Sequence, residues 1–210
     1  MSNKPAGPTP DQRRDANSVP EAESRSRNQP PPPGSLRGII DGLLQGSLVD
    51  LFQAYAVACA PLPRDGRSEP ERYPELSAII GFVSASDGKC GRASGRLSLS
   101  MSPEVLALMQ GERASQARHG DWSRELVNQL MGRFKNRLLP YGANLQAGLP
   151  TSIGREALEA GFDPVVGRRV YRARTLRGEV VATLDGSLNE SELSYVGPTT
   201  VASEGELILF

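Results

Sequence analysis

Residues 124–136 read Arg124-Glu125-Leu126-Val127-Asn128-Gln129-Leu130-Met131-Gly132-Arg133-Phe134-Lys135-Asn136. At about 100° per residue, the large apolar side chains of this stretch fall within one arc, which predicts the core face of an amphipathic helix. The arc contains Leu126, Val127, Leu130, Met131, Phe134 and Leu138. We predict a helix from about Asp121 to Tyr141, with Gly142 as its C-terminal cap.

The polar side of this helix carries an acidic and an amide side chain. Glu125 and Asn128 lie about 60° apart and one turn from each other, so both project the same way into solvent. Gly132 falls between them in projection, one turn further on. A glycine inside a helix costs about 1 kcal/mol relative to alanine. This cost is understandable if another molecule approaches the helix backbone closely at this point.

The types of these two side chains point to a kind of chemistry. A carboxylate can bind a partner's ammonium group, and a carboxamide offers both a donor and an acceptor with which to orient a water molecule. Neither group is a good nucleophile, and the chain has one histidine to serve as a base. Glu125 and Asn128 therefore suit the positioning of water in phosphoryl transfer, where alignment and electrostatics carry most of the catalysis.

The flanking sequence predicts an alternation of short helices and strands. Ser102, Pro103 and Glu104 form a strong helix start, with a capping hydroxyl, a proline at the first helical position and a carboxylate near the positive helix end. Further helices are predicted at 39–53 and 154–160, and the helix from Ser102 ends near Met109. Strands are predicted at 55–62, 78–83, 95–101, 143–149, 168–175, 178–184 and 205–210, with loops at 63–75 and 111–120 and a turn at 86–89. Because hairpins require antiparallel pairing, we predict an α+β fold with a mixed or antiparallel sheet packed against long helices.

The first 34 residues differ in composition from the rest of the chain. They contain eight of the 17 prolines and no aromatic residue. Such a segment cannot bury enough apolar surface to offset the entropy of ordering it. We therefore predict a disordered, Pro-rich tail at 1–34 and one folded domain at 35–210. The run Pro30 to Pro33 favours polyproline II and suits a spacer better than a ligand for a proline-binding module.

Composition excludes several classes of function. With 24 basic and 24 acidic residues, the net charge of zero gives no electrostatic reason to bind nucleic acid or an anionic membrane. The sequence has no run of about 20 apolar residues and no apolar leader, so we expect a cytoplasmic protein without a transmembrane helix. Cys59 and Cys90 are the only cysteines and, with one histidine, cannot form a usual zinc site. We expect two free thiols.

The helix and its surroundings resemble one known family. The pattern Glu125-Leu-Val-Asn128, Gly132, the run Phe134-Lys-Asn-Arg-Leu-Leu139 and the segment Gly148-Leu-Pro-Thr151 resemble the CheX-like chemotaxis phosphatases of the CheC/CheX/FliY superfamily. The resemblance covers roughly residues 36–210 and is most specific over 121–154. Related two-site members carry the Glu-x-x-Asn motif twice, whereas one copy here favours the one-site CheX-like branch.

The resemblance implies a specific activity. Family members hydrolyse the aspartyl phosphate of CheY-type response-regulator receiver domains. By this resemblance Asn128 and Glu125 are the catalytic residues: Asn128 orients the attacking water, and Glu125 pairs with the receiver's lysine. The Mg²⁺ belongs to the receiver, and no cofactor or metal is bound by this chain. Family members often dimerise through sheet edges, so a homodimer is compatible with the apolar strand predicted at 205–210.

Other interpretations of the same residues stay open. Glu125 could complement the helix dipole from the first turn, with Ser123 or Asp121 as cap, and Asn128 could be an ordinary surface residue. The domain could also be a non-catalytic dimerisation or docking module in chemotaxis or motility signalling. His119 is expected in an exposed loop. A weak resemblance to cyclic-di-nucleotide-binding PilZ domains rests on Arg168, Arg169, Arg172, Arg174, Asp185 and Ser187, although alternating arginines more often mark the solvent side of a strand.

Overall fold

The structure is a computed structural model that describes residues 38–63, 73–84, 93–110, 118–161, 168–188 and 190–198. Its α-helices are α1 (Ile39–Ala54), α2 (Pro103–Gln110), α3 (His119–Leu138) and α4 (Arg155–Ala160), and its 3-10 helices are η4 (Leu139–Tyr141) and η5 (Glu190–Glu192). Its strands are β1 (Ala60–Pro61), β2 (Leu76–Ser84), β3 (Ser94–Met101), β4 (Leu145–Ala147), β5 (Thr151–Ile153), β6 (Arg169–Thr175) and β7 (Gly178–Ser187).

All the described strands belong to one antiparallel sheet. Their order is β1-β6-β7-β3-β2-β4, and β5 also pairs with β2. The three long central strands are β2, β3 and β7. β2 pairs with β3 from Leu76 opposite Met101 onward, and β3 pairs with β7 from Ser94 opposite Ser187 onward. The chain therefore has the predicted α+β fold, and the sheet is purely antiparallel within the described residues.

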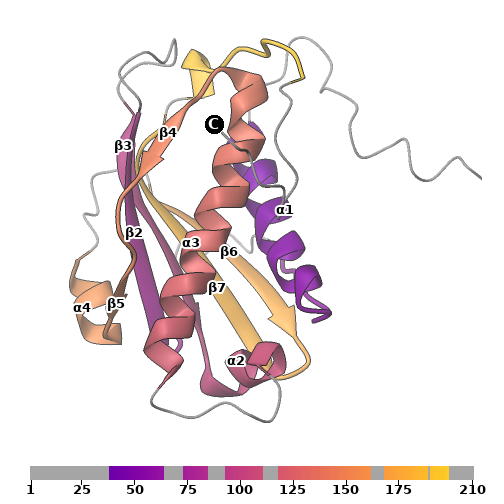
Figure 1. Ribbon diagram of the computed structural model, residues 1–210, viewed down its shortest axis with the longest axis vertical. Helices are drawn as coiled ribbons and strands as arrows, with labels where there is room; N and C mark the ends of the chain where they lie inside the picture. Colours follow the sequence, from indigo (N-terminus) through magenta and orange to yellow (C-terminus); the bar gives the residue numbers. More distant parts are fainter. Residues whose placement is uncertain are drawn as a thin grey trace, which may run out of the picture. The chain divides into compact units, whose positions relative to one another are not determined.

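The two long helices share one face of this sheet. α3 packs across β2 and β3, and α1 lies beside α3 and contacts β6 (Figure 1). On β7, Val180 and Ala182 belong to the main core, whereas Val181 packs with Leu158 of α4 in a separate small cluster. Because alternate residues of a strand point to opposite faces, α4 covers part of the other face.

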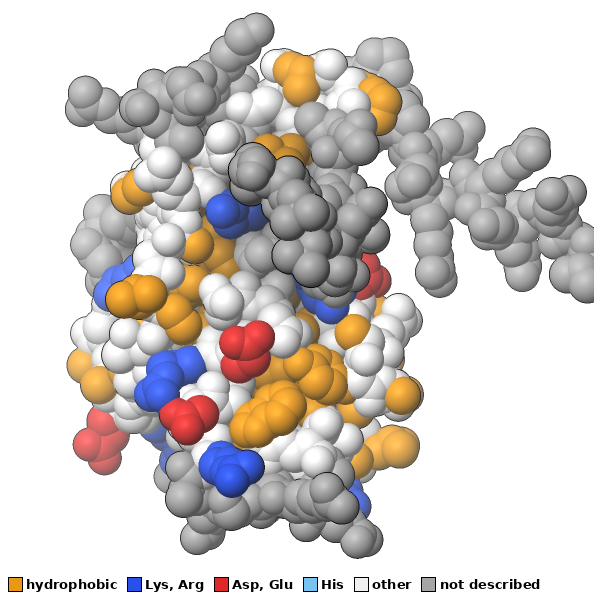
Figure 2. All heavy atoms as spheres, viewed as in Figure 1, with side chains coloured by type: hydrophobic (Ala, Val, Ile, Leu, Met, Phe, Trp, Pro, Cys, Tyr) orange, Lys and Arg blue, Asp and Glu red, His pale blue; other side chains and the backbone are white. Residues whose placement is uncertain are grey.

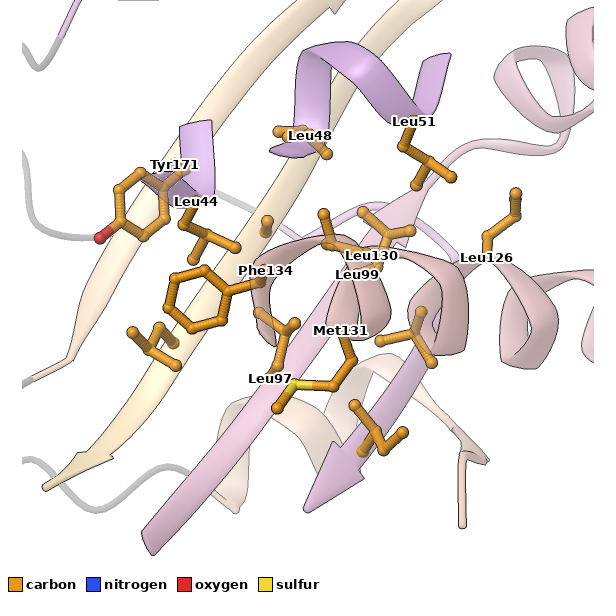
Figure 3. Close-up of a cluster of buried hydrophobic side chains, with 14 of the residues drawn as sticks. Leu44, Leu48, Leu51, Leu97, Leu99, Leu126, Leu130, Met131, Phe134 and Tyr171 are labelled. Atoms are coloured by element: carbon orange, nitrogen blue, oxygen red, sulfur yellow. The ribbon is translucent and has the colours of Figure 1, made fainter. Parts of the chain in front are cut away.

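The main core lies between the sheet and the two long helices. The six residues predicted to form the apolar arc of α3 are all fully buried. They share one core cluster with leucines from α1 and β3 and with Tyr171 of β6, and the close-up labels four of them among these residues (Figure 3). Tertiary packing of this kind supplies most of the stability of a helix in a protein. The apolar stripe of α3 thus positions the helix so that its opposite side faces away from the sheet.

The N-terminal end of α1 is hydrogen-bonded to the carboxylate of Glu190, 152 residues after Gly38 in the sequence. The backbone N–H groups of Gly38 and Ile40 donate to Glu190, at 3.0 and 3.3 Å. Arg169 donates both to Glu190, at 2.9 Å, and to Asp41, at 3.2 Å. Partial burial opposes the charge of Glu190, but these hydrogen bonds outweigh it and hold the pKa of this carboxyl below its ordinary value. The clamp supplies the cap that Gly38 itself lacks.

Several predicted boundaries agree with the structure. The helix predicted at 39–53 is α1, the central strands and the final hairpin appear near their predicted positions, and Gly142 caps the α3–η4 segment in the left-handed conformation, with φ 75°. At the start of α2 the Val105 N–H donates to the Ser102 hydroxyl at 3.4 Å. A hydrogen bond with the same hydroxyl lowers the pKa of Glu104. The predicted helix start is confirmed.

Other boundaries were wrong. His119 is the first residue of α3 and not part of a loop, and the regular helix ends at Leu138. The strand predicted at 55–62 is only the two-residue β1, and β5 was not predicted because its three residues gain a strand partner only from β2. The turn at 86–89, the strand at 205–210, the tail at 1–34 and most of the loop at 63–75 lie outside the described residues.

Candidate functional site

Helix α3 presents Glu125 and Asn128 to solvent. Both residues are exposed, while Leu126 and Val127 between them are fully buried. At a spacing of three residues their Cβ atoms lie about 5–6 Å apart on one helix surface. Figure 2 shows the molecule from the viewpoint of Figure 1. The surface in this view carries acidic, basic and hydrophobic side chains, and neither sign of charge dominates it. Both predicted site residues are therefore accessible to a second protein.

The start of α3 weighs against a purely local role for Glu125. The helix begins at His119, so Glu125 lies beyond the first turn, where the interaction of a carboxylate with the helix dipole has largely faded. Asp121 is the acidic residue of that first turn. Ser123 and Asp121, considered above as caps, lie inside the helix, whose N-cap is Arg118, and the Ser123 hydroxyl donates to the His119 carbonyl at 2.8 Å.

The Glu125 side chain is held by a hydrogen-bonded neighbour. The Nε2 group of Gln129 donates to Oε1 of Glu125 at 2.8 Å. The amide oxygen of Gln129 accepts a hydrogen bond from the hydroxyl of Tyr55, just after α1, at 3.0 Å. The Tyr55 ring in turn meets Trp122 edge to face, with centroids 6.1 Å apart and an interplanar angle of 70°. The acidic residue of the site is thus connected to both long helices.

The surface beyond the pair is open at Gly132. Among the described residues, a Cβ atom built on this glycine would meet no heavy atom within 4 Å beyond the helix's own backbone and its chain neighbours. No packing contact with the described part of the chain therefore requires a glycine here. The explanation in which a partner approaches the backbone at this point is compatible with this geometry.

The second residue of the pair, Asn128, is exposed on α3. In the described part of the chain its side chain has no hydrogen-bond partner, so its donor and acceptor are both available. The carboxylate and the amide can together bind a cation and a water molecule. No group of three or more His, Cys, Asp or Glu side chains that could hold a metal ion occurs among the described residues.

The arginines near the C-terminal hairpin serve as partners within the chain. Arg172 and Arg174 donate to Glu179 at 2.7 and 2.9 Å. Burial raises the pKa of the Glu179 carboxyl, but hydrogen bonds from both guanidinium groups outweigh it and leave this pKa below its ordinary value. Asp185 pairs with Arg96 at 2.8 Å. These bonds satisfy side chains that the cyclic-di-nucleotide hypothesis would need for a ligand.

One expectation about these arginines was only partly right. Arg172 and Arg174 lie on one side of β6, as predicted for a solvent-facing row. Arg169 is on the opposite side with Tyr171, where it joins the clamp at the start of α1. The alternation along the strand separates these guanidinium groups.

No helix within the described ranges has the length and apolar character needed to cross a bilayer.

The geometry defines an α+β protein that presents a carboxylate and a carboxamide on an open helix above an antiparallel sheet. No family model matches the sequence, and no curated protein matches it significantly. Solved structures do match. CheX from Vibrio vulnificus has a TM-score of 0.56 at 16% identity, over 73% of this chain and 99% of that chain. A CheC-like superfamily protein from Shewanella sp. PV-4 has a TM-score of 0.56 at 15% identity, over 70% and 97%.

A third match is the CheX–CheY–BeF₃–Mg²⁺ complex from Borrelia burgdorferi. Its TM-score is 0.53 at 12% identity, over 72% of this chain and 99% of that chain. At such identities the likeness is one of fold. This chain has a CheX-like fold, so the fold implied by the sequence resemblance is confirmed.

Sequence reasoning missed two residues of the site. Gln129 stands four residues after Glu125, and this spacing alone signals a side-chain contact on a helix. Tyr55 gave no comparable signal, because it precedes Gln129 by 74 residues and the two meet only when α1 packs on α3.

Proposed function

We propose that this protein hydrolyses the aspartyl phosphate of a CheY-type receiver domain. In this proposal Asn128 orients the attacking water in line with the phosphorus, and Glu125 pairs with the receiver's active-site lysine and so docks the two proteins. The receiver supplies its own Mg²⁺, and the reaction takes place in the cytoplasm. This chain then contributes alignment and charge but no covalent chemistry.

The observation that carries the proposal is the exposed pair on α3. Both side chains of the Glu-x-x-Asn motif are accessible, on a helix whose other side is fixed in the core. A rigid helix is a suitable base for positioning a water molecule, because small displacements cost large factors in rate. The CheX fold, and a solved complex in which a protein of this fold is bound to CheY, support a receiver as the partner.

The test is the loss of phosphate from a phosphorylated receiver. A panel of CheY-type receivers from the same organism is phosphorylated, mixed with the protein, and followed over time. We expect the wild type to accelerate the decay of at least one receiver. Asn128→Ala should reduce this acceleration about a hundredfold, since it removes the group that aligns the water.

A matched control lies on the same helix. Asn136 is also exposed on α3 but two turns further on, so Asn136→Ala should keep the wild-type rate. Glu125→Ala should raise the receiver concentration needed for half-maximal rate by about tenfold or more, because a charged partner is lost from the interface. If Asn128→Ala is as fast as wild type, the proposed mechanism is wrong. Receiver binding without acceleration by either protein would instead indicate the docking module.

A further inference from the structure

We propose that Gln129 is a positioning residue for Glu125, and that Tyr55 holds Gln129 in the orientation this requires. Gln129 fixes the carboxylate next to Asn128 without neutralising its charge. The proposal rests on the proposed function and adds how the acidic half of the site is held ready for a partner's ammonium group.

The direction of each hydrogen bond follows from the groups involved. An ionised carboxylate can only accept hydrogen bonds, so the NH₂ end of the Gln129 amide faces Glu125, at 2.8 Å. The oxygen end of the same amide then faces Tyr55, and the phenol must donate, at 3.0 Å. A single orientation of Gln129 satisfies both neighbours. Tyr55 therefore keeps the donor of Gln129 directed at Glu125.

Gln129 is placed to limit the motion of an exposed side chain. In projection Asn128 and Gln129 lie one turn beyond Glu125, about 60° to one side and about 40° to the other. An exposed glutamate samples several rotamers, and a bond to Gln129 selects among them. The bond uses Oε1, and in the described part of the chain Oε2 has no hydrogen-bond partner. One oxygen is thus held while the other is available.

The neutrality of the amide matters for the proposed docking. A lysine at this position would also bond Glu125, four residues earlier, but as an ion pair that competes with an incoming ammonium group. Glutamine supplies a donor and leaves the full negative charge. The aromatic contact of Tyr55 with Trp122 sets the phenol against α3 at the end of α1. The arrangement therefore depends on how the two helices pack.

The first test needs no receiver. We would follow the side-chain amide resonances of Gln129 by ¹⁵N NMR from pH 3 to pH 7. We expect their positions to depend on pH, and this dependence should vanish in Glu125→Gln and shrink in Tyr55→Phe. Asp121 lies one turn before Glu125 and pairs with Arg124. Subtracting the pH profile of the Glu125→Gln variant removes the contribution of Asp121 to the chemical shifts. The proposal would be overturned if the Gln129 amide shifts did not change with pH, or if they changed equally in the wild type and in Glu125→Gln.

The second test separates docking from chemistry. With a receiver that the wild type dephosphorylates, Gln129→Leu should raise KM about fivefold and Tyr55→Phe about threefold, with kcat changed less than twofold. Gln129→Lys should raise KM further than Gln129→Leu. Calorimetry with the same receiver carrying BeF₃⁻ and Mg²⁺ should show matching losses of affinity. An unchanged KM in Gln129→Leu, or a fall in kcat alone, would contradict the positioning role.

Matched controls exclude general effects of the substitutions. Gln146→Leu on β4 and Tyr195→Phe, both exposed and outside this network, should keep wild-type kinetics, and melting temperatures report any loss of folding. The two proposals fail differently. If no receiver is dephosphorylated, or Asn128→Ala is fully active, the proposed function fails while the NMR result still decides whether Gln129 holds Glu125. If Asn128→Ala is inactive but Gln129→Leu is normal, only the positioning role fails.

Discussion

Gly132 offers a test in which stability and function should move in opposite directions. Gly132→Ala places a methyl group where, apart from its chain neighbours and the helix's own backbone, no heavy atom of the described residues lies within 4 Å, so none of them clashes with it. Alanine is favoured over glycine inside a helix by about 0.8–1 kcal/mol. We therefore expect the free energy of unfolding to rise by about 1 kcal/mol and the melting temperature by about 2–4 °C.

The same methyl group should impair a partner that approaches the α3 backbone. Gly132 lies on the Glu125 side of the helix, two turns further on, and an added carbon extends about 1.5 Å from the backbone. A displacement near 1 Å at a reacting centre can cost about a hundredfold in rate. We expect Gly132→Ala to slow receiver dephosphorylation about tenfold or more.

Urea unfolding and phosphate release measure the two effects on the same preparations. Gly42→Ala is the matched control, because Gly42 is also a helical glycine whose Cβ position has nothing within 4 Å among the described residues outside its own helix, but it lies on α1. It should gain stability and keep its activity. A Gly132→Ala protein that is stabilised and fully active would refute the close approach. One that is destabilised would refute the stability argument itself.

Three further predictions concern the rest of the domain. Glu190→Ala removes the cap of α1 and should cost about 2 kcal/mol of unfolding free energy at pH 7. Because the folded-state pKa of Glu190 lies below the unfolded value, this stabilisation is present above pH 5 and lost as the pH falls through the folded-state pKa, so urea titrations of the two proteins should converge once the pH is below that folded-state pKa. Phe134→Ala, at a fully buried site, should cost about 3–5 kcal/mol in the same assay, and a loss under 1 kcal/mol would contradict the packing of α3 on the sheet. Burial raises the pKa of Cys59 to about 11, so in a Cys90→Ser background iodoacetamide at pH 8 should alkylate Cys59 about a hundredfold more slowly than a free thiol, and ordinary reactivity would show that the thiol is not buried.

The elements that sequence patterning predicted well are those whose periodicity is long and unambiguous. The apolar arc of α3 spans several turns, so the buried and exposed sides of the helix followed from spacing alone. The start of α2 was equally clear, since its capping hydroxyl, proline and carboxylate act locally. Short segments such as β1 and β5 were missed or overextended because their pairing partners are distant in the chain.

The amino-acid sequence by itself determined which side chains of α3 face outward, because an α-helix converts a spacing of three residues into a shared surface. That Glu125 and Asn128 form an accessible pair follows from this local rule. Only the tertiary structure decided what holds the pair. The packing of α1 on α3 brings Tyr55 to Gln129. Glu190 accepts a hydrogen bond from the backbone of Gly38 at the start of α1. Such contacts join residues far apart in the chain, so local periodicity carries no information about them.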